Sequence, residues 1–147
     1  MRLRFLFASA LVLLVLAVAP GPLHAQNEAA VDSAQQAAQA WLELLDADKY
    51  EATWTEAAAF FQSKVDTEQW VRQVKQAHGP LGDFQSRSLV EARYTSSMPN
   101  APEGEYVIAQ YRATYGSAEV VETVSLKKEQ DEWRVAAYLV RPNQNQQ

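Results

Sequence analysis

The chain has 147 residues, with 13 basic and 18 acidic side chains, two histidines and no cysteine. This length fits a single domain, and a composition of 48% hydrophobic and 21% charged residues is too apolar for a disordered chain. The lack of cysteine excludes disulfides, thiol nucleophiles and cysteine-ligated metals. No nucleotide-binding or hydrolase motif is present, so composition and motifs indicate location and fold rather than a reaction.

The N-terminus has the pattern of a secretory signal peptide. Arg2 and Arg4 precede an uncharged apolar run over residues 5–19, which is shorter than the roughly 20 residues that span a membrane. A Pro-Gly-Pro breaker and the small residue Ala25 follow. We therefore expect residues 1–25 to be a signal peptide cleaved after Ala25, with an uncleaved anchor as the alternative. The protein is then periplasmic or secreted and soluble, and it contacts the membrane only before cleavage.

Cleavage makes the chain more acidic. Residues 1–25 hold two of the 13 basic side chains and none of the 18 acidic ones, so the remainder carries a net charge of −7. Such a protein repels phosphate backbones and anionic lipid head groups. We therefore expect no nucleic-acid partner and no binding to membrane surfaces.

The first half of the mature chain has helical periodicity. Residues 28–47 form the first predicted helix, and Asp48 could cap a second one that breaks near residues 55–56. A third helix begins at Asp66, which has Gln69 three positions later as in a capping box. It ends at the Gly-Pro pair of residues 79–80.

After residue 82 the hydrophobic period changes to two. Strands are predicted at 84–95, 105–115, 119–128 and 132–141, joined by one long connection and two tight hairpins. Helices followed by consecutive hairpins predict an α+β fold, with N-terminal helices packed on a four-stranded antiparallel meander. We expect one domain over residues 26–141 and a disordered polar tail over 142–147.

The two hairpin turns predict the strand register. A turn at Gly116-Ser117 places Glu122 opposite Tyr111, and a turn at residues 130–131 places Glu122 opposite Leu139. The face that contains Glu122 is otherwise apolar. The opposite face also carries Ile108, Val121 and Val140, so it is predicted to be wet or at most half covered. Its expected polar members are Tyr106, Gln110, Arg112, Thr123, Ser125, Lys127, Arg134 and Tyr138, with Arg87 as a further solvated charge.

Glu122 is the candidate functional residue, because a carboxylate on an apolar face must be paired, altered in pKa or placed at a pocket edge. One interpretation is a polar anchor or acid–base group in a cleft, with Tyr111, Tyr50 and Trp54 as further ligand-binding candidates. The alternative is a structural carboxylate satisfied by Tyr50, a tryptophan indole or a basic side chain of the helices. No catalytic residue is assigned.

His78 is the one histidine left after cleavage, so it cannot build a multi-histidine metal site. Its place at the end of the third helix favours a role as a C-terminal capping residue. We predict no metal and no cofactor.

Several segments together resemble a known bacterial family, the domain of unknown function 4019. The resemblance rests on Ala40-Trp41-Leu42, Tyr50 with Trp54, Glu68-Gln69-Trp70, Pro80-Leu81-Gly82, Arg87, residues 99–107, Val121-Glu122-Thr123-Val124 and residues 133–138. It covers about residues 34–141 and implies a small exported bacterial domain without an assigned activity. More loosely, the layout resembles the nuclear transport factor 2-like and cystatin-like folds, which include both enzymes and binding modules.

Three functional hypotheses follow. The first is an exported, non-catalytic module that binds an unidentified small ligand or an envelope protein. The second is a cofactor-free acid–base enzyme of the isomerase or dehydratase type that uses Glu122 in an apolar pocket. The third is an envelope interaction domain, in which the wet sheet face forms a homodimer.

Overall fold

The computed structural model describes residues 22–143, so most of the expected signal peptide (residues 1–21) and residues 144–147 of the predicted tail lie outside this range. The elements are α1 (Pro22–Asp46), α2 (Tyr50–Thr55), α3 (Ala59–Gln62), α4 (Thr67–His78), a 3-10 turn (Gly79–Leu81), β1 (Phe84–Thr95), β2 (Tyr106–Tyr115), β3 (Glu119–Glu129) and β4 (Glu132–Pro142). Over this described part of the chain, none of the helices has the length and apolar character needed to cross a membrane.

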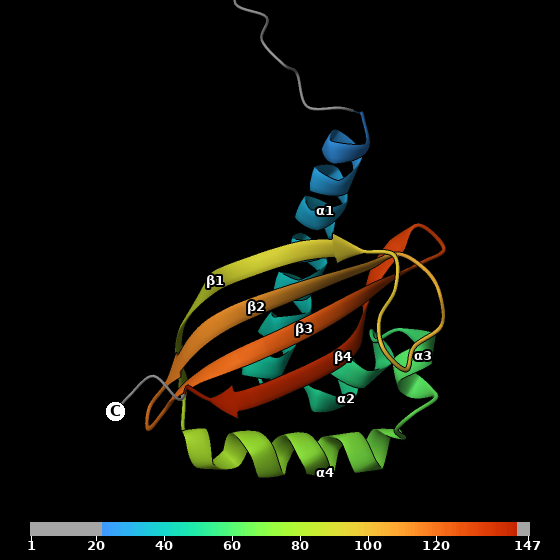
Figure 1. Ribbon diagram of the computed structural model, residues 1–147. Coiled ribbons are helices and arrows are strands. Elements are labelled where there is room, and N and C mark those ends of the chain that lie inside the picture. Colours follow the sequence, from blue (N-terminus) through green and yellow to red (C-terminus); the bar gives the residue numbers. More distant parts are fainter. Residues whose placement is uncertain (1–21, 144–147) are drawn as a thin grey trace, which may run out of the picture.

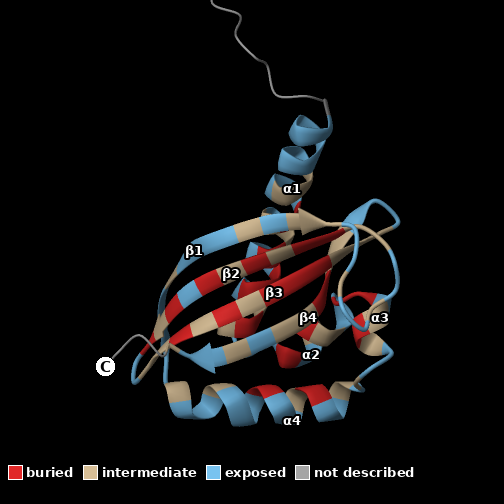
Figure 2. Ribbon diagram, in the orientation of Figure 1, coloured by how far each residue is buried: buried red, intermediate tan, exposed pale blue. Residues whose placement is uncertain are grey.

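The strands form one antiparallel sheet in the order β1-β2-β3-β4, and the helices lie against one of its faces (Figure 1). Helix α1 crosses behind all four strands, whereas α4 runs alongside β4. This arrangement confirms the predicted α+β fold. Buried residues are concentrated on β2, β3 and the sheet-facing side of α1 (Figure 2), so the main core lies between the sheet and the helices.

The helix boundaries follow local capping. The Asp66 carboxylate accepts a 2.8 Å hydrogen bond from the Gln69 backbone N–H, so the predicted cap of α4 is confirmed, and α4 ends at His78 as expected. The cap predicted for α2 is wrong. Lys49 occupies that position, and Asp48 instead adopts a φ of 57° and accepts a hydrogen bond from the Tyr50 hydroxyl.

The predicted register between β2 and β3 is confirmed along the whole hairpin. Tyr115 N–H donates to the Ala118 carbonyl at 2.8 Å to close the turn, and Tyr111 pairs with Glu122. The inward residues of both strands are buried, and Glu122 has no exposed surface. The sequence pattern therefore identified the face of this hairpin correctly.

The predicted face of β4 is wrong beyond Val135. A β-bulge between the Ser125 and Leu126 pairs adds Ala136 to β4, which reverses the alternation. Val140 rather than Leu139 is therefore opposite Glu122, Tyr138 faces the helices, and Leu139 is 44% exposed. The Val135 carbonyl at the bulge accepts a 2.8 Å hydrogen bond from Ala58 N–H, which joins the helical layer to the sheet.

One end of the supposedly wet sheet face is also covered. The connection between β1 and β2 folds over it towards α3 (Figure 1), and a second core cluster forms there from Ala58, Tyr106 and Ala136. Tyr106 is fully buried, and its hydroxyl donates to the Pro102 carbonyl at 2.5 Å. The prediction that Tyr106 lies on a solvated face is therefore wrong.

Candidate functional site

Glu122 lies at the centre of a buried polar cluster. Its carboxylate accepts two hydrogen bonds from the Arg87 guanidinium, Nε to Oε2 at 2.5 Å and Nη2 to Oε1 at 3.1 Å. The hydroxyls of Tyr115 and Tyr138 donate to Oε1 at 2.9 and 2.7 Å. The carboxylate that the sequence singled out is thus fully paired, and its partners come from three different strands.

Arg87 is the residue that this site needs and that the sequence interpretation placed wrongly. It pairs with Ala113 in the β1–β2 register, which turns its side chain towards the helices, where only 11% of it is exposed. Its Nη1 and Nη2 also donate to the two carboxylate oxygens of Asp46 at 2.7 and 2.9 Å. One guanidinium therefore joins the end of α1 to the centre of the sheet.

The contacts among Arg87, Asp46 and Glu122 determine which side chains of the cluster are charged. Burial alone would lower the pKa of Arg87, but its hydrogen bonds to Asp46 and Glu122 outweigh this effect and raise the pKa. Burial and the nearby Glu122 charge raise the pKa of both Tyr115 and Tyr138. Both phenols therefore stay neutral and act as hydrogen-bond donors at ordinary pH.

This geometry does not suit Glu122 to acid–base catalysis. A general base must reach the proton that it removes, and Glu122 has no surface exposed to solvent or to a ligand. Every donor around it belongs to the protein's own core. The structural interpretation of Glu122 fits better, with partners from β1, β2 and β4 instead of Tyr50, an indole or a helix.

The polar cluster continues to His78 at the end of α4. His78 Nε2 lies 3.0 Å from the Tyr138 hydroxyl oxygen, whose own proton is donated to Glu122. Nε2 must therefore carry a proton and donate it to Tyr138, which leaves the lone pair on Nδ1. The His78 ring also stacks on the Tyr138 ring, with 5.9 Å between the two ring centroids.

Burial lowers the pKa of His78, although three carboxylates nearby oppose this effect. The charged groups that act on the imidazole are Glu122, Asp46 and Asp48, which favour its protonation, and Arg87, which disfavours it. The net lowering means that the folded protein prefers the neutral imidazole.

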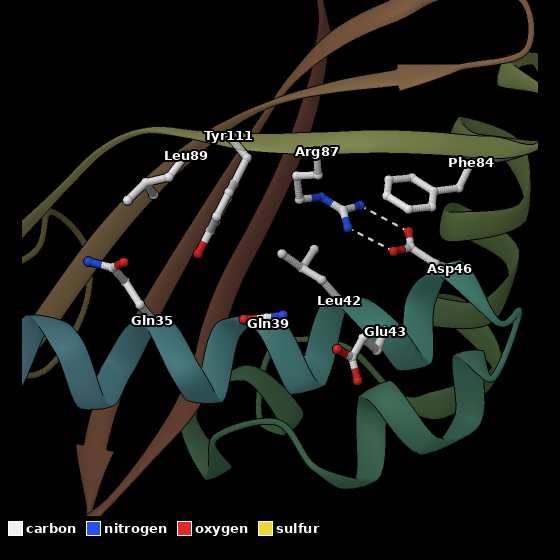
Figure 3. A pocket seen from close by; sticks show the side chains of 9 residues that line it. All are labelled: Gln35, Gln39, Leu42, Glu43, Asp46, Phe84, Arg87, Leu89 and Tyr111. Atoms are coloured by element: carbon white, nitrogen blue, oxygen red, sulfur yellow. Dashed lines mark hydrogen bonds and ion pairs between the residues drawn. The ribbon is translucent and has the colours of Figure 1, made fainter.

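A cleft opens beside the cluster, between α1 on one side and strands β1 and β2 on the other (Figure 3). We call it the α1–β1 cleft. Its volume is about 390 Å³, which is within the range of about 300–1,000 Å³ usual for small-molecule sites. The lining residues are Gln35, Gln39, Leu42, Glu43, Asp46, Phe84, Arg87, Leu89 and Tyr111.

Tyr111 provides an unpaired polar group at the floor of this cleft. Its side chain extends from β2 towards α1, and the hydroxyl ends near Gln35 and Gln39 (Figure 3). Tyr111 is only 8% exposed, yet within residues 22–143 its hydroxyl has no hydrogen-bond partner. Every fully buried polar side-chain atom of that range is paired, so the hydroxyl oxygen must belong to the small part of Tyr111 that remains accessible. Burial raises the pKa of Tyr111, so this hydroxyl keeps its proton and is a ready hydrogen-bonding group for a ligand.

Other residues that line the cleft also carry polar groups without a partner in the described chain. Of the five N–H groups of Arg87, one on Nη1 has no acceptor in the described chain. The amides of Gln35 and Gln39 likewise make no side-chain hydrogen bond there. The α1–β1 cleft therefore combines a fixed ion pair with free hydroxyl and amide groups.

The remaining predicted ligand-binding residues lie elsewhere. The Tyr50 hydroxyl donates to Asp48 at 2.5 Å, and this residue lines a different cleft, which also contains His78 and Tyr115. The Trp54 indole N–H donates to the Val65 carbonyl at 2.8 Å. The structure therefore brings Tyr111 next to Glu122 but separates Tyr50 and Trp54 from the α1–β1 cleft.

In the part of the chain that the structure describes, no group of three histidine or acidic side chains is arranged to hold a metal ion.

The site residues that sequence reasoning missed are Arg87, Asp46, Tyr115, Tyr138, Gln35 and Gln39. One signal for Arg87 was available, because a buried Glu122 requires a cation and β1 carries few basic residues.

Comparison with known proteins identifies the family and leaves the activity open. The model of the family described as "Protein of unknown function (DUF4019)" matches residues 37–138, so the chain belongs to this family. No curated protein matches the chain at a significant level. Among solved structures, Aln2 from a Streptomyces species is similar with 11% identity and a TM-score of 0.49, over 84% of this chain and 93% of that one. A likeness this distant carries no argument about function.

Substituting Glu122→Gln should destabilise the fold strongly. Arg87 keeps Asp46, but the amide that replaces the buried carboxylate has an NH2 group that cannot accept the hydrogen bonds donated by Arg87, Tyr115 and Tyr138. Removing one partner of a buried ion pair costs about 3–5 kcal/mol. Urea unfolding measures this loss. The control is Glu119→Gln, which removes a partly exposed pair with Arg112 and should cost about 0–1 kcal/mol. Equal losses for the two variants would contradict the assigned pairing.

His78 should make the stability depend on pH. Because the pKa of His78 is lowered in the folded state, the unfolded chain binds a proton more tightly than the folded one. The folded state therefore loses free energy of unfolding as the pH falls below about 6.5. We expect the free energy of unfolding of the native chain to fall more steeply between about pH 7.5 and 5.5 than that of His78→Gln. Parallel curves would show that His78 is not linked to folding.

Proposed function

We propose that this member of the DUF4019 family is an exported, non-catalytic module that binds a small molecule in the α1–β1 cleft. The observation that carries the proposal is the position of the Tyr111 hydroxyl. Tyr111 is more than nine-tenths buried, but its hydroxyl has no partner within the described chain and points into the cleft. The hydroxyl oxygen is accessible at the cleft, so in the free protein it pairs with water, and a ligand that replaces this water gains a hydrogen bond to a side chain that the core already holds in place.

The surrounding structure suits a binding site that does not change shape. Arg87 and Asp46 are held together by two hydrogen bonds, and Arg87 is anchored in turn by Glu122. Leu42 is buried and fixes the wall on the side of α1. A site supported in this way needs little reorganisation when a ligand enters, which favours affinity.

The arrangement of carboxylates supports a non-catalytic role over the acid–base alternative. The cleft offers hydrogen-bonding groups, but Asp46, the carboxylate beside its floor, is already paired with Arg87. Glu122 has no access to the cleft surface. The residues around the floor can therefore position a ligand, whereas none of them is placed there as a free acid or base.

Export is the part of this proposal that rests on sequence. Arg2, Arg4, the apolar run and Ala25 supply the parts of a cleavable signal. We expect the protein expressed in a bacterial host to appear in the periplasm or medium, with an intact mass that corresponds to a chain starting at Gln26. Recovery of full-length chain in the membrane fraction would instead support an uncleaved anchor.

Tyr111→Phe should remove ligand binding without harming the fold. Because the hydroxyl has no internal partner, we expect the free energy of unfolding to change by less than about 0.5 kcal/mol. The binding assay is an NMR amide-shift screen with a mixed set of neutral, anionic and cationic water-soluble metabolites. Compounds that bind should shift the side-chain amides of Gln35 and Gln39 in the native protein, and these shifts should weaken in Tyr111→Phe.

Tyr94→Phe provides the matched control, because this half-buried tyrosine also lacks a side-chain partner in the described chain and lies by a separate depression near the start of α1. It should bind like the native protein. A screen in which no compound shifts the cleft amides would overturn the proposed function. Equal binding by both tyrosine variants and the native protein would do the same.

A further inference from the structure

We propose that the ligand of the α1–β1 cleft is an uncharged polyhydroxylated compound, a saccharide unit. This inference rests on the proposed binding function and specifies the chemistry of its ligand. It follows from three properties of the cleft: its charge, its hydrogen-bonding groups and its apolar walls.

The charge of the cleft disfavours anionic ligands. Arg87, the one cation among the lining residues that the structure describes, is matched by two carboxylates, those of Asp46 and Glu122. Carboxylates therefore outnumber the guanidinium. A phosphate or carboxylate entering the cleft would meet repulsion and would have to displace carboxylates already bound bidentately to Arg87.

Cationic ligands also lack a partner at the floor of the cleft. Both Asp46 oxygens accept hydrogen bonds from Arg87, and the side chain of Glu43, which borders the cleft on α1, points away from the strands (Figure 3). The Tyr111 side chain extends towards the part of α1 that carries the neutral amides of Gln35 and Gln39 (Figure 3). An ammonium group bound there would lose water without gaining a counter-charge.

Hydroxyl groups match what the floor offers. An amide has both donors and an acceptor, and a phenol can donate and accept. Gln35, Gln39 and Tyr111 can therefore each pair with a ligand hydroxyl in either direction, and the unused Nη1–H of Arg87 adds a donor. An array of this kind suits a ligand in which every polar group is both donor and acceptor, which describes the hydroxyls of a sugar.

The walls supply the apolar contact that a sugar ring also needs. Leu42 is buried beneath the cleft, while Phe84 and Leu89 are 36% and 44% exposed. Leu89 lies beside Tyr111, whereas Phe84, whose ring packs against the Arg87 guanidinium, lies at the opposite end of the cleft (Figure 3). A sugar ring at the Tyr111 end can therefore place C–H groups on Leu89 while its hydroxyls meet the amides. Large exposed apolar side chains beside polar groups are characteristic of ligand sites.

The test is an NMR titration of the purified protein with probes of different charge. Methyl glucoside, maltose and N,N′-diacetylchitobiose are the neutral sugars, D-glucuronate is the anion, and putrescine is the cation. We expect at least one neutral sugar to shift the Gln35 and Gln39 side-chain amides with saturation, and glucuronate and putrescine to bind at least about tenfold more weakly. Tyr111→Phe should weaken the sugar about 2- to 12-fold, as loss of one hydrogen bond predicts.

Charge variants of Gln35 make the result decisive. Gln35→Glu and Gln35→Lys should both weaken the sugar, because each replaces an amide that donates and accepts. A cationic ligand would instead gain affinity in Gln35→Glu, and an anionic ligand would gain in Gln35→Lys. Tyr94→Phe, which lies outside the cleft, should leave the sugar titration unchanged.

The outcomes separate this inference from the proposed function. Tyr111-dependent binding of putrescine or glucuronate, or of other non-sugar compounds from the metabolite screen, would overturn the sugar assignment and leave the binding function intact. Absence of any compound that shifts the cleft amides would overturn both. Saturable sugar binding that is weakened in Tyr111→Phe and kept in Tyr94→Phe supports both.

Discussion

The ion pair between Arg87 and Glu122 is the constraint on which the rest of the structure depends. A carboxylate with no exposed surface requires an opposite charge and further donors, since an unpaired buried charge is very costly. The cation comes from β1, two hydroxyls come from β2 and β4, and Asp46 at the end of α1 binds the other side of the guanidinium. The strand alignment and the docking of α1 are therefore linked through one guanidinium.

The sequence allowed the prediction of those parts in which local signals act alone. Three predicted features each depend on a few neighbouring residues: the Asp66 cap, the end of the helix before Gly79-Pro80 and the turn at Gly116-Ser117. The structure confirms each of them. The β2–β3 register followed from that turn. Glu122 could therefore be recognised as an inward carboxylate before any partner was known.

The parts that could not be predicted depend on contacts between distant segments. The bulge at Ala136 reverses β4, and it fits the structure because the Val135 carbonyl meets the Ala58 N–H of the helical layer. Neither hairpin turn carries a signal for it. In the same way, β1 follows the helices without a hairpin of its own and contains two register irregularities, so its alternation could not show that Arg87 points inward.

The shared guanidinium also restricts how this protein can vary in sequence. Arg87 contacts Asp46 and Glu122 together, so loss of the guanidinium leaves two carboxylates without a counter-charge, whereas loss of either carboxylate leaves Arg87 paired with the other one. A neutral residue at position 87 therefore requires a neutral residue at position 122, whose carboxylate has no exposed surface, and position 46 must then lose its carboxylate or gain access to water. The residue at position 87 therefore limits what can stand at positions 46 and 122, although 41 residues separate Asp46 from Arg87 and 35 separate Arg87 from Glu122.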